Sequence, residues 1–375
     1  MPKMLNSLAK SVILLLQNHI SRLGYTPVIH FEWEGCYRSH NGSKAVNFSQ
    51  INQRLQQMDI GGKLIPEYWA HQWEYVSLFN GQSPLMEAEY LTQAMTCLPK
   101  LFAEQGIEQT LIKPVVWAGD KGKLAQGCEN IFSDDGRAVH IPNAIQMNIS
   151  VNNALGKNIV TDGGFGEYLQ YCFLRSSLAC SLLYLPEEEA FERFALKSKY
   201  GLADELCSPS DISGGHQGSV ALYKKYGKHN QSMGETPLVY DHLHQVIVSE
   251  HLWQQTARIE HRLGASSVFY NPYINVIYAL VNIIDALQAY KETSCQALTP
   301  EVFEPIALPL SLYCQQDAPG AITLFAQDNW FADAIDKVEQ SEMQSSDNSQ
   351  QPGSMVGTRL KSAILDRYQR PKIII

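Results

Sequence analysis

The chain has 375 residues, a formal net charge of −9 and 45% hydrophobic residues, which is enough apolar material for one large domain or two ordinary ones. The acidic balance excludes a nucleic-acid binder that relies on bulk positive charge, since the densest basic cluster, at 223–229, is short. The apolar run near the N-terminus is too short for a membrane span and lacks a cleavage site, so no membrane segment is expected. The 8 cysteines are scattered without a CxxC pair, which predicts a reducing, cytoplasmic location.

Helical spacing of the apolar residues predicts five helices and a helical C-terminal region. Gly24 ends the first of them, and Gly106 ends the third. Asn47 or Ser49 lies at the start of the second, and Pro272 opens the fifth. The predicted helices cover 3–23, 47–59, 84–106, 164–184 and 271–292, and the helical region covers 308–340.

Runs rich in aromatic and β-branched residues predict five strands between the helices. A polar loop is expected at 118–138, and residues 186–235 are expected to be irregular. The predicted strands cover 26–37, 62–78, 109–117, 143–153 and 257–263. Strands dispersed among helices make α+β the predicted fold class.

The composition changes near the C-terminus. Residues 339–358 are rich in Ser and Gln, which predicts a disordered linker. The basic and apolar stretch at 359–375 is expected to be an unstructured tail, and an interaction peptide is the alternative. The predicted organisation is therefore one domain at 1–338, a linker at 339–358 and a tail at 359–375.

Five glutamates stand on strand-like segments. Glu32 and Glu34 are two residues apart and share one face of a strand, where like charges repel. Glu67 and Glu74 flank "YWAHQW" in the next strand, and Glu260 lies between two arginines in "RIEHR". Any one of them alone is more commonly a strand-edge or salt-bridged residue. A ring of five is costly unless divalent cations neutralise it, and oxygen ligands suit Mg²⁺ or Mn²⁺.

Histidines and tryptophans near these glutamates have simpler interpretations. His30 and His71 are expected to fill the core or to support the carboxylates from behind. His261 alternates with Glu260, so its side chain should face away from the acidic group. Trp69 and Trp73 are expected to pack in the core rather than to stack on a substrate.

The order of these segments resembles the catalytic domain of the glutamine synthetase family. The order runs E-x-E, then two glutamates with "QW" before the second, then "KP", "NIS" with "GKN", "RIEHR" and "NPY". The stretches "HQWEYVSLFNGQSPLMEAEYLTQAM" and "RIEHRL…NPYINVIYALVNIID" are similar to two stretches of the family, and the resemblance covers roughly residues 5–340. It implies a curved antiparallel sheet backed by helices, with two metal ions at its site.

The resemblance also implies a role for each matching residue. Of two Mg²⁺ or Mn²⁺ ions, one would be held by Glu34, Glu67 and Glu74, and the other by Glu32 and Glu260. Arg262 would stabilise the phosphoryl group in transfer, and Gln146 stands where the family has a metal-binding histidine. The remaining implied positions are nucleotide-binding Asn148, Ser150 and Lys113, substrate-binding Lys199 and Arg258, and the flap residue Glu205.

The activity that the resemblance implies is an ATP-dependent carboxylate–amine ligase, which γ-glutamylates an amine through an acyl phosphate. Two departures bear on it. Gln217 and Leu222 replace the family's nucleotide arginines, and no β-grasp domain precedes the first helix. A homo-oligomer or a partner protein would then complete the amine side of the site. The alternative is a catalytically degenerate binding or scaffold protein, which we disfavour because retained, unneutralised carboxylates are costly.

Overall fold

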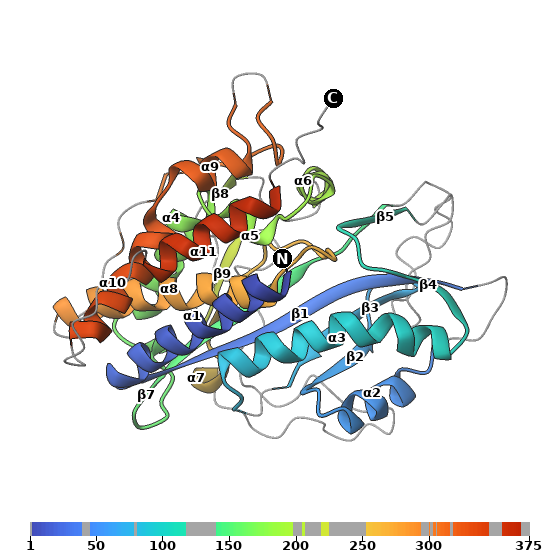
Figure 1. Ribbon diagram of the computed structural model, residues 1–375. Coiled ribbons are helices and arrows are strands. Elements are labelled where there is room, and N and C mark those ends of the chain that lie inside the picture. The colour runs from blue at the N-terminus through green and yellow to red at the C-terminus, as the bar shows by residue number, and fades with distance from the viewer. Residues whose placement is uncertain are drawn as a thin grey trace.

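One large sheet with long helices beside it organises the computed structural model of the chain (Figure 1). Among the described residues, no helix is long and apolar enough to cross a membrane. The structure describes residues 2–39, 46–78, 81–117, 140–197, 205–206, 219–224, 253–293, 300, 303–304, 306–315, 318–344 and 355–368.

Seven strands form the main sheet, and every pairing between them is antiparallel. Their spatial order is β2–β3–β1–β7–β10–β9, and β4 pairs with β1 as well. The strands are β1 (Tyr25–Ser39), β2 (Gly62–Pro66), β3 (Gln72–Ser77), β4 (Ile107–Leu111), β7 (Ile145–Asn153), β9 (Val220–Tyr223) and β10 (Arg258–His261). Two short ladders lie apart from it, β5 (Val115–Trp117) with β6 (His140–Pro142), and β8 (Glu205–Leu206) with β11 (Ile306–Ala307).

Long helices lie along this sheet, and α1 and α3 run beside β1 in Figure 1. Their buried side chains and those of α8 join the apolar residues of β1 in one hydrophobic core. The helices are α1 (Pro2–Arg22), α2 (Phe48–Gln57), α3 (Pro84–Glu104), α4 (Phe165–Ser177), α5 (Ser181–Tyr184), α6 (Glu189–Lys197), α7 (Trp253–Thr256), α8 (Pro272–Glu292), α9 (Ala321–Gln327), α10 (Trp330–Gln344) and α11 (Val356–Leu365). Two 3₁₀ turns, η1 (Ile159–Thr161) and η3 (Asp366–Tyr368), complete the described elements.

The central strand β1 packs tightly against β3. Trp33 is fully buried, and its ring meets that of Trp73 edge to face, with centroids 4.8 Å apart. Gly35 lies opposite Trp73 in the β1–β3 ladder. A Cβ at Gly35 would come within 2.3 Å of the Trp73 indole, so the packing of this tryptophan requires glycine there. Trp73 is therefore a core residue, as the sequence predicted.

The predicted α+β class, with an antiparallel sheet backed by helices, is confirmed. The single strand predicted at 62–78 is wrong, because β2 and β3 form a hairpin around 67–71. His71 holds a positive φ of 68° in this turn, and Gln72 N donates to Trp69 O. The fold of the hairpin matters for the site, since it sets Glu67 and Glu74 on either side of one turn.

Three other predicted elements differ from the structure. The strand expected at 109–117 is two strands, because Pro114 lacks the amide that a continuous ladder needs. The helix expected at 164–184 is interrupted between α4 and α5. The segment expected to be irregular at 186–235 contains α6, which buries Ala190, Phe191 and Arg193.

The end of the chain also departs from the predicted linker and tail. Helix α10 continues to Gln344, and α11 begins at Val356, so 339–344 and 356–358 are helical; residues 345–354 lie outside the described residues. Helix α11 packs on α10 and α1 and buries Leu360 and Ile364 in the main core. Residues 359–368 are therefore part of the folded domain, because their apolar side chains have a face to cover.

Candidate functional site

The register of the main sheet brings the predicted acidic and amide residues to one face. Glu34 lies opposite Glu74 in the β1–β3 ladder, and Glu32 lies opposite Gln146 in the β1–β7 ladder. Residues two apart on a strand point to the same side, and directly opposed residues do so as well. Three strands therefore contribute Glu32, Glu34, Glu74 and Gln146 to the same side of the sheet.

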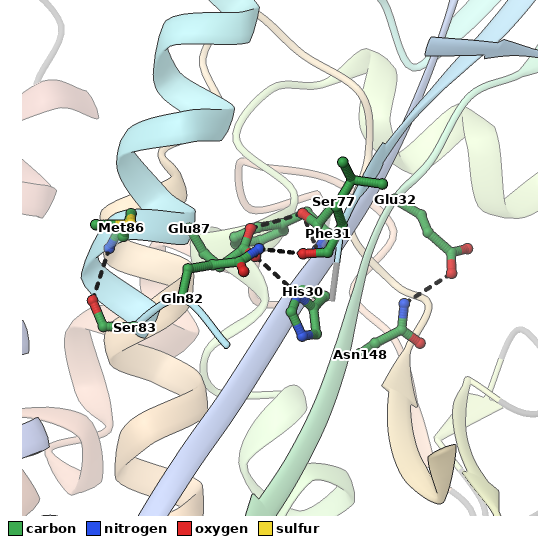
Figure 2. A network of polar contacts seen from close by, with 10 residues as sticks. His30, Phe31, Glu32, Ser77, Gln82, Ser83, Met86, Glu87 and Asn148 are labelled. Carbon is green, nitrogen blue, oxygen red and sulfur yellow. Dashed lines mark hydrogen bonds and ion pairs between the residues drawn. The ribbon is translucent and has the colours of Figure 1, made fainter. Parts of the chain in front are cut away.

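The fourth strand of this face, β10, carries the predicted Arg258, and the predicted Arg262 directly follows its end. Glu260 lies opposite Asn148 in the β7–β10 ladder, so Arg258 and Glu260 join the same side. Asn148 Nδ2 donates to Glu32 Oε1 at 2.8 Å, and Arg258 Nε donates to Asn148 Oδ1 at 2.6 Å. Figure 2 shows Glu32 and Asn148 reaching toward one another across β1 and β7. Asn148 thus links the carboxylate of β1 to the guanidinium of β10.

Glu260 is 3% exposed and lies between two guanidinium groups. Arg258 Nη2 is 3.4 Å from Glu260 Oε2, and Arg262 Nε is 3.7 Å from Glu260 Oε1. The Arg258 guanidinium also stacks over the Tyr223 ring, 4.8 Å from its centroid. Burial, with the Glu260 carboxylate nearby, raises the pKa of Tyr223 to about 12. The protein therefore supplies positive charge to this carboxylate from the residues two positions before it and two positions after it.

Glu34 is buried at the other end of the face. Its Oε2 accepts a hydrogen bond from Ala144 N at 2.8 Å, so the carboxylate is held against the start of β7. Glu67 is partly buried, and its backbone N donates to Gln72 O at 3.1 Å within the β2–β3 hairpin. The hairpin thus brings Glu67 to the same end of the sheet as Glu34 and Glu74.

Arg193 lies near these residues, although no sequence pattern indicated it. It comes from α6, is 2% exposed, and donates to the carbonyl oxygens of Leu263 and Arg262 at 3.4 and 3.3 Å. Burial lowers the pKa of Arg193 to about 10, an effect that the Glu34 carboxylate opposes and Arg262 adds to. Its guanidinium therefore stays charged near neutral pH, close to Glu34 and Arg262. A buried arginine in "FERF" was hidden because 186–235 gave no clear periodicity.

Whether these residues suit a divalent cation can be tested on their chemistry. Carboxylate and amide oxygens are the donors that Mg²⁺ and Mn²⁺ prefer. Gln146 Oε1 is buried and makes no hydrogen bond within the described part of the chain, as a ligand awaiting a cation would. Within those same residues, no three His, Cys, Asp or Glu side chains lie together as a ready metal-holding group. The donor set fits a hard cation, and convergence of the side chains on it stays a prediction.

His261 lies behind this face, whereas His30 belongs to it by register, because it is two residues before Glu32 on β1 and opposite Asn148. His261 is buried between α4, α5 and α8, where its ring packs against Phe173, Tyr184 and Tyr278. It therefore faces away from Glu260, as predicted. His30 is buried beside α3, and its Nδ1 lies 2.8 Å from Glu87 Oε1.

Two of the remaining predicted residues, Lys113 and Ser150, are described outside this network. Lys113 is more than half exposed and sits 3.8 Å from Glu189 of α6. Ser150 is partly buried on β7, opposite Val28. Lys199 lies outside the described residues, and only the backbone of Glu205, in β8, is described. A cavity of about 260 Å³ between α1, α3 and residues 268–272 contains none of the predicted site residues.

Comparison with known proteins gives matches among solved structures. Neither a protein-family model nor a curated protein matches the sequence. A structure described as a novel glutamine synthase homolog aligns over 95% of this chain and 74% of its own, with a TM-score of 0.56 and 14% identity. GmaS without ligand and a GmaS/ADP complex each align over 97% of this chain and 75% of their own, with TM-scores of 0.57 and 11% identity. The chain therefore has a glutamine synthetase-like fold, which is what the order of its motifs predicted.

Proposed function

We propose that this protein is an ATP-dependent carboxylate–amine ligase that works with Mg²⁺ or Mn²⁺. The observation that carries the proposal is the shared face of β1, β3, β7 and β10, where register aligns Glu32, Glu34, Glu74, Gln146 and Glu260. A fold of this kind forms a complex with ADP in GmaS, which supports a nucleotide substrate here. Free thiols at all five described cysteines suit a reducing compartment.

The proposed reaction has two steps. The γ-phosphoryl group of ATP passes to a carboxylate oxygen of the acid substrate, for which glutamate is our choice, and ADP leaves. The nitrogen of an amine then attacks the acyl carbon, the bond from that carbon to the phosphate oxygen breaks, and the amine loses a proton. When bound, the divalent cations would neutralise phosphate charge during the first step.

The chain's own residues have distinct roles in this proposal. Glu34, Glu67 and Glu74 would hold one cation, and Glu32, Glu260 and Gln146 the other. Arg262 and Arg193 present buried positive charge where charge develops on the transferred group. Arg258, Asn148, Ser150 and Lys113 would line the substrate and nucleotide side, and Lys199 and Glu205 stay predictions for the substrate and the flap.

The two arginines beside Glu260 favour a second candidate function, a binding protein that no longer catalyses the reaction. Glu260 is contacted by both Arg258 and Arg262, so protein cations already neutralise part of the charge that a metal would neutralise. Such a protein would bind nucleotide without releasing ADP. Assembly with copies of itself, or with a partner protein, belongs to either candidate.

The deciding experiment measures the thermal midpoint with Mn²⁺, Mg²⁺ and ATP, and ADP release with glutamate and a panel of amines. Ligand at about 100 times its Kd should stabilise the protein by about 2.7 kcal/mol. Glu67→Ala should abolish the shift by Mn²⁺, whereas Glu104→Ala, at an exposed position of α3, should leave it unchanged. A midpoint that neither metal nor ATP moves would overturn the ligase proposal, and a shift by ATP without ADP release would select the binding protein.

A further inference from the structure

A buried carboxylate joins the start of α3 to the central strand. Glu87 lies in the first turn of α3 and is buried. Its Oε1 is contacted by His30 Nδ1 at 2.8 Å and by the Gln82 side-chain amide, and its Oε2 accepts from Ser77 Oγ at 2.7 Å. Figure 2 shows these side chains converging on Glu87 from β1, the end of β3 and the turn before α3.

Burying this polar network costs more free energy than filling the same volume with apolar side chains would. A buried carboxylate is stable only when it is hydrogen-bonded or paired, and apolar residues of similar volume commonly do as well or better for stability. Apolar side chains fill nearly all the rest of the buried face of α3, as Leu91 and Leu98 do. A directed polar network in that setting fixes geometry, because each hydrogen bond has a required distance and angle.

The network around Glu87 fixes the position at which the ladder between β1 and β3 ends. The last register pair between β1 and β3 is Glu32 with Val76. One residue before Glu32, the backbone N of Phe31 donates to a side chain, Ser77 Oγ, at 3.1 Å. Glu87 holds that same hydroxyl, so it determines where β3 separates from β1, next to Glu32.

His30 connects the network to β7, the strand that pairs with the other edge of β1. It is the register partner of Asn148, the residue that hydrogen-bonds Glu32 and Arg258. Both strand neighbours of Glu32 on the N-terminal side, Phe31 and His30, are thus tied to Glu87. We propose that Glu87 and His30 are positioning residues, which hold β1 so that Glu32 projects into the candidate cation site.

The catalytic meaning of this proposal rests on the proposed function, but the positioning itself can be measured without any ligand. In the double variant Glu87→Leu/His30→Leu, apolar side chains replace the pair, so the thermal midpoint should change little. Hydrogen exchange of the backbone amides at 29–33 should become about 10-fold faster, while exchange in α8 stays unchanged. Affinity for Mn²⁺ should fall by about 10-fold.

Glu89→Leu is the matched control, because Glu89 lies two residues away on α3 and pairs at the surface with Lys10 at 2.7 Å. It should alter neither the exchange at 29–33 nor the affinity for Mn²⁺. Glu87→Gln keeps the size of the side chain and should give a smaller change of the same kind if the double variant does not fold.

Three results would overturn the inference. Exchange at 29–33 could stay as in the parent protein, or it could accelerate equally in α8, which would indicate a purely global role. In a parent protein that binds Mn²⁺, unchanged affinity in the double variant would remove the link to the site. A parent protein that binds no Mn²⁺ contradicts the proposed function instead, and the exchange measurement then still decides the positioning role.

Discussion

The two faces of β1 differ in what holds them. On one face, Phe31 and Trp33 are fully buried and pack with aromatic residues and with the core that α1, α3 and α8 share. On the other, Glu32 accepts from the Asn148 side-chain amide, and Glu34 accepts from the backbone N of Ala144 and lies near Arg193 of α6. The first face is stabilised by removal of apolar surface from water, which is not directional. The second depends on register and hydrogen-bond geometry, because each carboxylate needs a donor or a cation in a definite place.

Alternate residues of a single strand can therefore serve different purposes, with one face stabilising the fold and the other carrying the candidate chemistry. Substitutions that change the size or shape of side chains on the apolar face should lower the free energy of unfolding, since the core is closely packed. Residues of the acidic face add little stability, and some of them oppose it, since Glu34 and Glu74 are like charges in one register pair. Changes on the two faces should therefore have opposite effects.

The largest effect is expected on the apolar face. Trp73→Ala removes a fully buried ring that contacts Trp33 and Phe102, so the free energy of unfolding should fall by about 3–5 kcal/mol. Urea unfolding measures this loss. Trp117→Ala, at a half-exposed ring of β5, should cost less than about 1 kcal/mol. Equal losses for the two variants would contradict the assignment of Trp73 to the core.

The pH dependence tests the residue directly behind the acidic face. Burial lowers the pKa of His261 from 6.5 to about 3, so the folded protein leaves this ring neutral where the unfolded chain protonates it. Stability from His261 is therefore complete above pH 6.5 and is lost as the pH falls toward 3. Between pH 7 and pH 5 this group should remove about 2 kcal/mol from the free energy of unfolding.

His261→Phe should lose this part of the pH dependence while filling a similar space. Unfolding by urea at pH 7, 6 and 5 in the parent and the variant gives the comparison. Parallel curves for the two proteins would show that His261 is accessible to protons in the folded state.

A smaller effect is expected where α11 joins the apolar core. Asp336 accepts hydrogen bonds from the backbone N of Gly357 and Thr358 and from Thr358 Oγ1. Asp336→Ala leaves these amides without their acceptor at the start of the helix, so stability should fall by about 1–2 kcal/mol. Asp333→Ala, at an exposed position of α10, is the control variant, and the thermal midpoint is the measurement. A free tail at 359–368 would instead make the two variants indistinguishable.

The smallest expected effect has the opposite sign. Glu74→Gln removes one of two like charges that face each other across β1 and β3, so the metal-free protein should gain about 0.2–1 kcal/mol. Urea unfolding in the presence of a chelator measures this gain, with Glu108→Gln on β4 as a control at an exposed strand position. A loss of stability would show that repulsion between Glu34 and Glu74 is not the dominant effect of this charge.

Much of the fold could be predicted from periodicity and boundary residues. Helix α2 begins after Asn47, whose side chain accepts from Gln50 N, and α8 begins at Pro272, both as the sequence indicated. The hairpin at 62–77 could not be predicted, because its turn contains no glycine and its strands read as one alternating run. Helix α11 was missed because low-complexity residues before it obscured an apolar face at Leu360 and Ile364.

The sequence by itself determined the α+β class, the long helices, the core tryptophan and the pairing of Glu32 with Glu34 on one strand face, because these depend on local spacing. Only the tertiary structure decided which residues share that face. Register placed Glu74, Gln146, Asn148 and Glu260 beside the two glutamates, and packing of α6 brought Arg193 to them. Except for the pairing of β1 with β3, these contacts join segments more than a hundred residues apart, and no local pattern specifies the order in which strands pair.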